Sequence, residues 1–263
     1  MASSIECIAL DLDGTLLEPG AVILPEVVAT LTGFVQQGGR VVIATGRTYS
    51  NIIGLLERNG ILPRLTFPHA IISNERDLHL READAFVPVE PRNSALTASE
   101  SRLLGRARQV LASAEEELRA RGLETAPANR ELEERRGFAE RRFADTEQAE
   151  IAKGVVSALI PQGLPMFVFS NNHLISLRYV HATKGRVLHE LCQQHWDLTP
   201  RSVLAIGDAH NDLDMLDGTW GFACGTVANA STDIRSVVEA RGGGIASTER
   251  GRGVAELVTR LVS

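Results

Sequence analysis

Two carboxylates, Asp11 and Asp13, lie two residues apart at the end of an apolar, β-rich run, and Gly14 follows them directly. Open α/β sheets bind ligands at the carboxyl ends of their strands, where acidic side chains can face a crevice. One carboxylate could then act as a nucleophile while the other exchanges protons with a leaving group and with water. The same residues would also form an ordinary acidic turn, because Asp-Gly pairs are common in turns. This motif alone does not separate the two interpretations.

A second acidic motif, residues 207–212 (GDAHND), follows another apolar run and adds Asp208 and Asp212. If both motifs lie at one edge of one sheet, their four acids share a crevice, where two carboxylates about 4 Å apart repel each other by roughly 4 kcal/mol. A bound phosphate dianion would add to this repulsion, so a divalent cation is needed. A site made only of oxygen ligands is typical of Mg²⁺. Asp208 would also serve as a helix N-cap, which is compatible with binding a metal.

Two further segments could hold phosphate oxygens. Thr45, Gly46 and Arg47 end one predicted strand and precede a helix, so a hydroxyl, backbone amides and a guanidinium are available there. Of the 27 basic residues only Lys153 and Lys184 are lysines, and Lys184 begins a predicted helix. A lysine in that position could neutralise phosphoryl oxygens and restrain the acids. The structural alternatives are a helix cap for Thr45 and solvent-exposed side chains for Arg47 and Lys184.

The elements that must position these residues are those of a doubly wound α/β sheet. Short apolar runs, each followed by turn residues and a helical pattern, predict buried parallel strands over residues 5–11, 40–45, 69–73 and 202–208. Helices are predicted over residues 25–37, opening with a proline that the first turn tolerates, and over residues 48–58. The alternation of strand and helix implies right-handed crossovers and a Rossmann-like core.

The middle of the chain has a different pattern. A long helix rich in Arg and Glu is predicted over residues 94–122, with an interruption at Gly105. Residues 165–171 and 174–180 predict an antiparallel hairpin with a two-residue turn. We therefore predict an inserted α/β cap with an antiparallel sheet that selects the substrate. The predicted boundaries are 83–182 for the cap, and 1–82 with 183–263 for the catalytic core.

Composition narrows the class of partner. A net charge of −6 gives no reason to expect nucleic acid or an anionic membrane. No apolar run is long enough to cross a bilayer, and residues 1–10 lack the pattern of a signal peptide, so a cytoplasmic location is expected. Cys7, Cys192 and Cys224 are far apart in apolar surroundings, which predicts core packing rather than disulfides or a thiolate metal site. The expected partner is a small molecule.

Four segments resemble, in order, the four motifs of the haloacid dehalogenase superfamily: residues 11–17 (DLDGTLL), 44–47 (ATGR), 184–185 (KG) and 207–215 (GDAHNDLDM). An α/β insertion between the second and third motifs resembles the Cof-type branch, subclass IIB, whose members include sugar phosphatases and phosphomannomutases. The resemblance covers both core segments well and the cap only in outline. It implies a phosphohydrolase with a cap that closes over a small phosphorylated metabolite and excludes bulk water.

The resemblance also implies roles for single residues. Asp11 would accept the phosphoryl group and form an aspartyl-phosphate, and Asp13 would act as general acid and then as general base. Thr45 and Lys184 would bind the transferring phosphoryl group. Relatives that cleave carbon–halogen bonds lack an acid at the position of Asp13, so phosphoryl chemistry is favoured for this chain.

The metal site implied by the resemblance draws on both acidic motifs. Asp11, Asp208 and the backbone carbonyl of Asp13 would hold Mg²⁺, and Asp212 and Asn211 would support them, with Asn211 also available to the phosphate. We expect the substrate to be a sugar or sugar-acid phosphate monoester, and the protein to be a monomer or a homodimer. A phosphomutase, or a non-catalytic ligand-binding protein on the same fold, are the alternatives.

Two segments depart from the family pattern. In members of the family, an Asn-Gly pair usually lies where the chain passes from the core into the cap. This chain has residues 73–76 (SNER) there. Where a Gly-Asn-Ala loop usually follows the fourth motif, it has the longer residues 224–230 (CGTVANA). Both departures bear on the identity of the substrate more than on the reaction.

Overall fold

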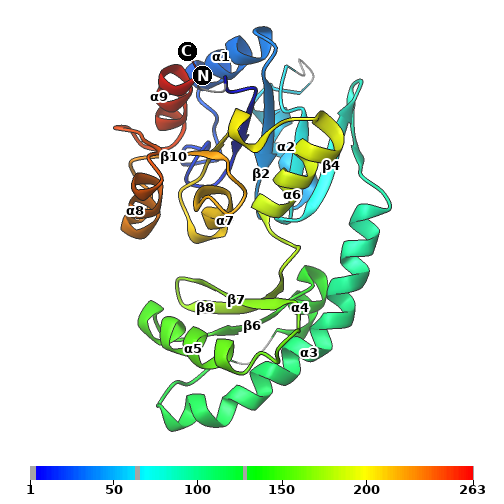
Figure 1. Cartoon of the computed structure of the whole chain (residues 1–263), viewed down its shortest axis with the longest axis vertical. Coiled ribbons are helices and arrows are strands. Elements are labelled where there is room, and N and C mark those ends of the chain that lie inside the picture. The colour runs from blue at the N-terminus through cyan, green and yellow to red at the C-terminus, as the bar shows by residue number, and fades with distance from the viewer. Residues whose placement is uncertain (1–3, 63–65, 127–128, 263) are drawn as a thin grey trace. The chain divides into compact units, whose positions relative to one another are not determined.

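The chain folds into two compact units, one formed by Met1–Val89 with Thr183–Ser263 and the other by Glu90–Ala182 (Figure 1). We call them the core and the insert. The computed structural model describes residues 4–62, 66–126 and 129–262. The first boundary lies after Val89 and not after residue 82, because strand β5 (Ala85–Pro88) pairs with its neighbour in the core sheet.

The core contains an eight-stranded sheet with the order β11-β10-β9-β1-β2-β3-β4-β5. Strands β11 to β3 in this order are parallel to one another, whereas β4 and β5 are antiparallel additions at one edge. The other strands are β1 (Cys7–Leu10), β2 (Arg40–Ala44), β3 (Ala70–Ser73), β4 (Asp77–Glu82), β9 (Val203–Ile206), β10 (Ala223–Thr226) and β11 (Gly244–Ile245). The four strands predicted from apolar runs and the doubly wound sheet are confirmed.

Helices cover both faces of this sheet because its strands are apolar on both sides. Ile8 and Leu10 belong to one buried cluster and Cys7 and Ala9 to another. The first cluster includes residues of α1 (Pro25–Gln36), α2 (Tyr49–Arg58) and α9 (Arg250–Leu261). The second includes residues of α6 (Lys184–Leu191), α7 (Leu213–Leu216) and α8 (Thr232–Ala240). Both helices predicted for the first core segment are therefore confirmed.

Short turns complete the core. A π-helical turn (Cys192–Trp196) continues α6, and 3-10 turns occupy Pro200–Ser202 and His210–Asp212. Cys7, Cys192 and Cys224 are buried and free, as predicted.

The insert has a three-stranded antiparallel sheet with the order β6-β8-β7. Its elements are α3 (Arg92–Ala120), α4 (Arg130–Arg136), β6 (Ala139–Arg142), α5 (Thr146–Ala158), β7 (Met166–Asn171) and β8 (Leu174–Tyr179). The predicted hairpin is confirmed. The predicted interruption at Gly105 is wrong, because α3 is continuous: a glycine in a helix costs only about 1 kcal/mol, and Leu104, Ala107 and Leu111 pack in the buried cluster on either side of it.

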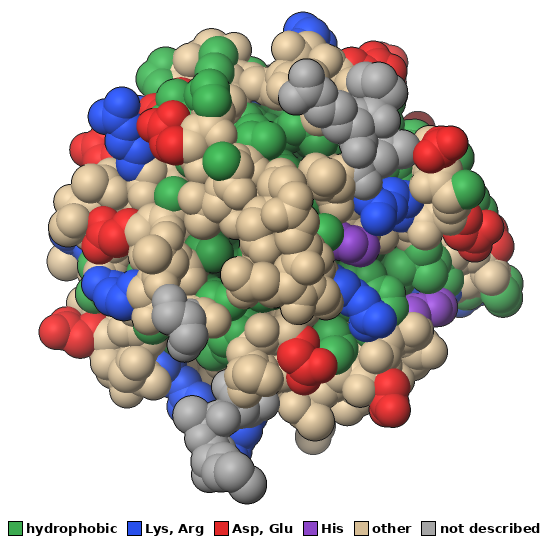
Figure 2. Space-filling view, turned by 90° about the horizontal axis from the view of Figure 1, so that it is seen from above, with side chains coloured by type: hydrophobic (Ala, Val, Ile, Leu, Met, Phe, Trp, Pro, Cys, Tyr) green, Lys and Arg blue, Asp and Glu red, His purple; other side chains and the backbone are tan. Residues whose placement is uncertain are grey.

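The surface carries charges of both signs. On the face viewed in Figure 2, basic and acidic side chains are interspersed. Among the described residues, none of the helices is both long enough and apolar enough to cross a bilayer.

Candidate active site

Three neighbouring strand ends meet at one edge of the core sheet. The strands lie in the order β9-β1-β2, and all three are parallel. Asp11 directly follows β1, Thr45 directly follows β2, and Asp208 lies two residues beyond the end of β9. Since the carboxyl ends of parallel strands point the same way, motifs far apart in the sequence converge at this edge.

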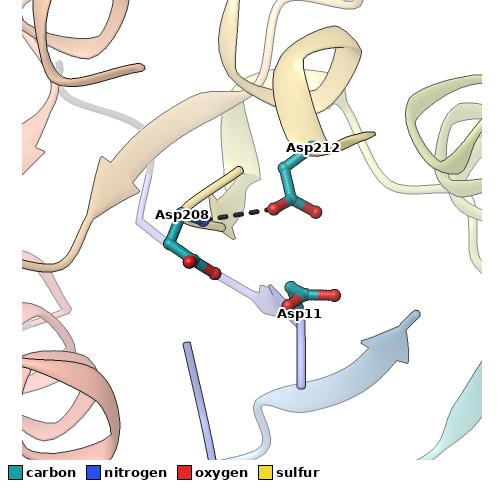
Figure 3. Close-up of side chains that lie close together, drawn as sticks. All are labelled: Asp11, Asp208 and Asp212. Carbon is teal, nitrogen blue, oxygen red and sulfur yellow. Dashed lines mark hydrogen bonds between the residues drawn. The ribbon is translucent and has the colours of Figure 1, made fainter. Parts of the chain in front are cut away.

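Three of the predicted acids form a cluster. Carboxylate oxygens of Asp11, Asp208 and Asp212 lie within 4.8 Å of one another (Figure 3). Asp212 Oδ2 accepts hydrogen bonds from the backbone N–H groups of Asp208 and Ala209, each at 3.1 Å. Thr15 Oγ1 donates to Asp208 Oδ1 at 2.6 Å. Each carboxylate on the second acidic motif is therefore held in place by a hydrogen bond from the protein.

This donor set fits a divalent cation. Hard oxygen ligands converge from three side chains, two of which, Asp11 and Asp212, are buried. Buried carboxylates are costly unless a positive charge compensates them. The carboxylate of Asp13 is not part of this cluster; the metal-binding role predicted for Asp13 concerned its backbone carbonyl, and its side chain was predicted to act as general acid and base.

Lys184 lies against the acidic cluster. Its Nζ donates to Asp11 Oδ1 at 2.6 Å and to Asp212 Oδ1 at 2.7 Å, and the residue is 1% exposed. Lys184 is the first residue of α6, whose start is held by Asp214: Oδ2 accepts the N–H groups of Gly185 at 2.9 Å and of Arg186 at 3.3 Å. The lysine is therefore not solvated, and the alternative of an exposed side chain is wrong for it.

One ammonium does not compensate three carboxylates. Burial lowers the pKa of Lys184, but Asp11 and Asp212 raise it by more, so the lysine stays protonated. Burial raises the pKa of Asp11 well above its ordinary value, an effect that Lys184 offsets only in part. Burial also raises the pKa of Asp208 to about 6, against the lowering effect of the Thr15 hydrogen bond. The unfavourable charge that remains would favour the binding of a cation at this cluster.

Asp13 and Arg47 form an ion pair beside the cluster. Arg47 Nε donates to Asp13 Oδ2 at 2.8 Å, and Nη2 donates to Oδ1 at 2.6 Å. Thr45 is buried and its Oγ1 accepts the N–H of Arg47 at 3.3 Å. The sequence offered a phosphate contact or an exposed side chain for Arg47, and this bidentate pair with Asp13 was not predicted.

Two residues that lie at the site, Glu75 and Asn229, were not predicted from the sequence. Asn211 Nδ2 donates to Glu75 Oε1 at 3.0 Å. Asn229 Nδ2 donates to the carbonyl of Gly14 at 2.8 Å, while its Oδ1 accepts the N–H of Arg250 at 2.8 Å. Glu75 and Asn229 lie in the two segments that depart from the family pattern, and that departure was the available signal for them.

Known proteins with related sequences support this picture. A family model described as haloacid dehalogenase-like hydrolase matches residues 8–75 and 129–257. Phosphoglycolate phosphatase from Methanothermobacter thermautotrophicus is 30% identical over 125 residues, which are 46% of this chain and 53% of that protein. The match thus spans about half the length of this curated relative.

Solved structures share the fold. Sucrose-phosphatase from Synechocystis sp. PCC6803, in complex with sucrose and phosphate, has a TM-score of 0.67 at 17% identity, covering 98% of both chains. A haloacid dehalogenase-like hydrolase from B. subtilis has a TM-score of 0.66 at 19% identity, covering 98% of this chain and 100% of that one. At these identities the likeness concerns the fold alone.

The close approach of Gly14 to Asp208 generates a testable prediction. Gly14 has φ +85°, and a Cβ there would lie 2.3 Å from Asp208 Oδ2. Gly14→Ala should therefore push Asp208 out of the cluster and weaken Mg²⁺ binding, measured by titration calorimetry, at least about tenfold.

Gly20→Ala is the matched control. Gly20 has φ +81°, and a Cβ added there would meet nothing within 4 Å, so both variants should lose about 1–2 kcal/mol of unfolding free energy from backbone strain. Only Gly14→Ala should lose metal affinity. Equal metal affinity in the two variants would contradict the assignment of Asp208 to the cation site.

Proposed function

Because this chain belongs to the haloacid dehalogenase-like hydrolases, we propose that it is a Mg²⁺-dependent phosphatase. Its substrate is a phosphate monoester of a small metabolite, a sugar or sugar acid, and the reaction runs through an aspartyl-phosphate on Asp11. The observation that carries this proposal is the cluster of Asp11, Asp208 and Asp212 at adjoining strand ends, with Lys184 bonded to two of them. The similarity to a phosphoglycolate phosphatase supports phosphoryl chemistry.

The chain's own groups bind the phosphoryl group. The Thr45 hydroxyl, the Gly46 amide, the Lys184 ammonium and the Asn211 side-chain amide supply hydrogen-bond donors for its oxygens. Thr45 and Lys184 are both buried, so their positions are set before the substrate arrives. Preorganised donors of this kind stabilise charge in the transition state without a reorganisation cost at that moment.

The reaction proceeds in two displacements. A carboxylate oxygen of Asp11 attacks phosphorus, the bond from phosphorus to the ester oxygen breaks, and Asp13 gives its proton to that oxygen. Asp13 then takes a proton from water as the water oxygen attacks phosphorus. The bond between phosphorus and the Asp11 oxygen breaks, which releases phosphate and restores both carboxyl groups to their starting forms.

The ion pair with Arg47 constrains the first step. Arg47 donates two hydrogen bonds to the Asp13 carboxylate, one to each oxygen, and so occupies the oxygens through which Asp13 would pass a proton to the ester oxygen. Asp13 must be protonated to act as an acid, so Arg47 has to leave it. We propose that Arg47 transfers to a phosphate oxygen when the substrate binds, which frees Asp13 to take up a proton.

The acidic cluster would hold the metal. Asp11 and Asp208 would bind Mg²⁺ together with the backbone carbonyl of Asp13, and Asp212 would support them while bonded to Lys184 and to backbone amides. When bound, Mg²⁺ neutralises the carboxylates and the phosphate during in-line attack.

The proposal predicts that the purified protein with Mg²⁺ releases phosphate from an aryl phosphate. Asp11→Asn should lower this rate at least about a thousandfold, because it removes the nucleophile. Asp197→Asn makes the same chemical change at an exposed residue with φ 52°, which asparagine tolerates, and should keep the parent rate. A parent protein without turnover above background, or an active Asp11→Asn variant, would refute the proposed function.

The pH dependence of metal binding gives a separate check. Burial raises the pKa of Asp208 to about 6 without the ion, so this carboxyl group is protonated at lower pH and must lose its proton to bind Mg²⁺. Calorimetry should therefore show Mg²⁺ binding about tenfold weaker at pH 5 than at pH 7. An affinity constant across this range would argue against Asp208 as a ligand.

A further inference from the structure

A hollow lies at the edge of the core sheet opposite the candidate active site. Arg40 is the first residue of β2, whereas Thr45 follows the last residue of that strand. His69 directly precedes β3, which is parallel to β2. The hollow has a volume of about 240 Å³, and its lining includes Arg40, His69, Arg81, Glu82, His195 and Trp196. It is therefore separate from the acidic cluster.

The guanidinium of Arg40 is held in place at this hollow. It lies over the ring of Trp196, 5.0 Å from the ring centroid, and its Nη1 donates to the Trp196 carbonyl at 3.4 Å. Stacking uses the face of the guanidinium plane and leaves its edge for hydrogen bonds, for which the group has five N–H donors. Among the residues that the structure describes, no carboxylate pairs with Arg40. An anion can therefore accept two parallel hydrogen bonds from it.

Two histidines add donors to the same hollow. Nδ1 of His69 accepts the N–H of Val41 at 3.1 Å, so the neutral ring carries its proton on Nε2. Burial, together with the charges of Arg81 and Arg40, lowers the pKa of His69 to about 4, which keeps the ring neutral near pH 7. His195 is exposed, and its ring offers an N–H in either tautomer.

The size and the donors of the hollow narrow the class of ligand. Pockets that enclose drug-sized molecules have volumes of about 300–1,000 Å³, so this hollow suits a smaller molecule. A carboxylate has two oxygens, and a bidentate contact with Arg40 would occupy both. A phosphate group has further oxygens, which can accept hydrogen bonds from His69 and His195. The arrangement of donors therefore favours phosphate over carboxylate.

We propose that the core binds a phosphate group in this hollow, apart from the candidate active site, as inorganic phosphate or as a small phosphate ester. Arg40 donates two hydrogen bonds to the phosphate oxygens, and His69 and His195 donate one each. The Trp196 ring holds the guanidinium in position before the ligand arrives. The inference does not depend on the reaction proposed for Asp11.

The fluorescence of Trp196 can report binding at the hollow. The chain has two tryptophans, so Trp220→Phe leaves Trp196 as the single one. Inorganic phosphate added to this variant, freed of metal ions, should change the Trp196 emission and reach saturation. Sodium chloride at the same ionic strength should not. Glycerol 3-phosphate should also bind, and whichever of the two ligands binds more tightly shows whether the free ion or an ester is the preferred ligand.

Three substitutions in the Trp220→Phe background test the donors. Arg40→Gln should weaken phosphate binding at least about tenfold, because it removes the bidentate contact. His195→Ala removes an exposed donor while Arg40 stays in place, and should weaken binding about threefold or more. Arg201→Gln removes the same charge as Arg40→Gln from an exposed residue outside the hollow, and should bind phosphate as the parent does.

Three results would overturn the inference. The first is an emission that phosphate leaves unchanged or alters no more than chloride does. The second is parental phosphate affinity in both Arg40→Gln and His195→Ala. The third is an Arg201→Gln variant that loses as much affinity as Arg40→Gln, because binding would then reflect the general charge of this edge and not the donors of the hollow.

Discussion

The buried ammonium of Lys184 between Asp11 and Asp212 is the interaction on which the site depends. Removing one partner from a buried ion pair typically costs about 3–5 kcal/mol, because the remaining charge is left uncompensated. Asp11 comes from the first core segment and Lys184 from the second. The pair therefore forms only when both segments share one sheet, which the pairing of β1 with β9 achieves. The ion pair at the candidate site therefore depends on the strand order of the core sheet.

The same pair explains why the site needs more positive charge. Lys184 is shared by two carboxylates, while Asp208 accepts its hydrogen bond from the neutral hydroxyl of Thr15. In the function that we propose, a divalent cation would supply the missing charge and would let a phosphate dianion approach Asp11.

The elements that could be predicted from the sequence are those with a distinctive local pattern of residues. The strands ending at Asp11, Thr45 and Asp208 were predicted because buried parallel strands are continuous apolar runs. Strands β4 and β5 were not, because both are antiparallel and partly exposed, and β4 is rich in polar residues. The contacts of Glu75 and Asn229 depend on how loops fold against distant strands, which no residue spacing encodes. The roles assigned to the site residues remain predictions.

The proposed metal site requires that Asp11 and Asp208 bind one cation beside Lys184. Anomalous diffraction from crystals grown with Mn²⁺, a stand-in for Mg²⁺ that can be located by its own signal, tests it most directly. We expect one strong peak within bonding distance of carboxylate oxygens from both Asp11 and Asp208. A well-ordered site with no peak there, or an ion bound without Asp11, would contradict it.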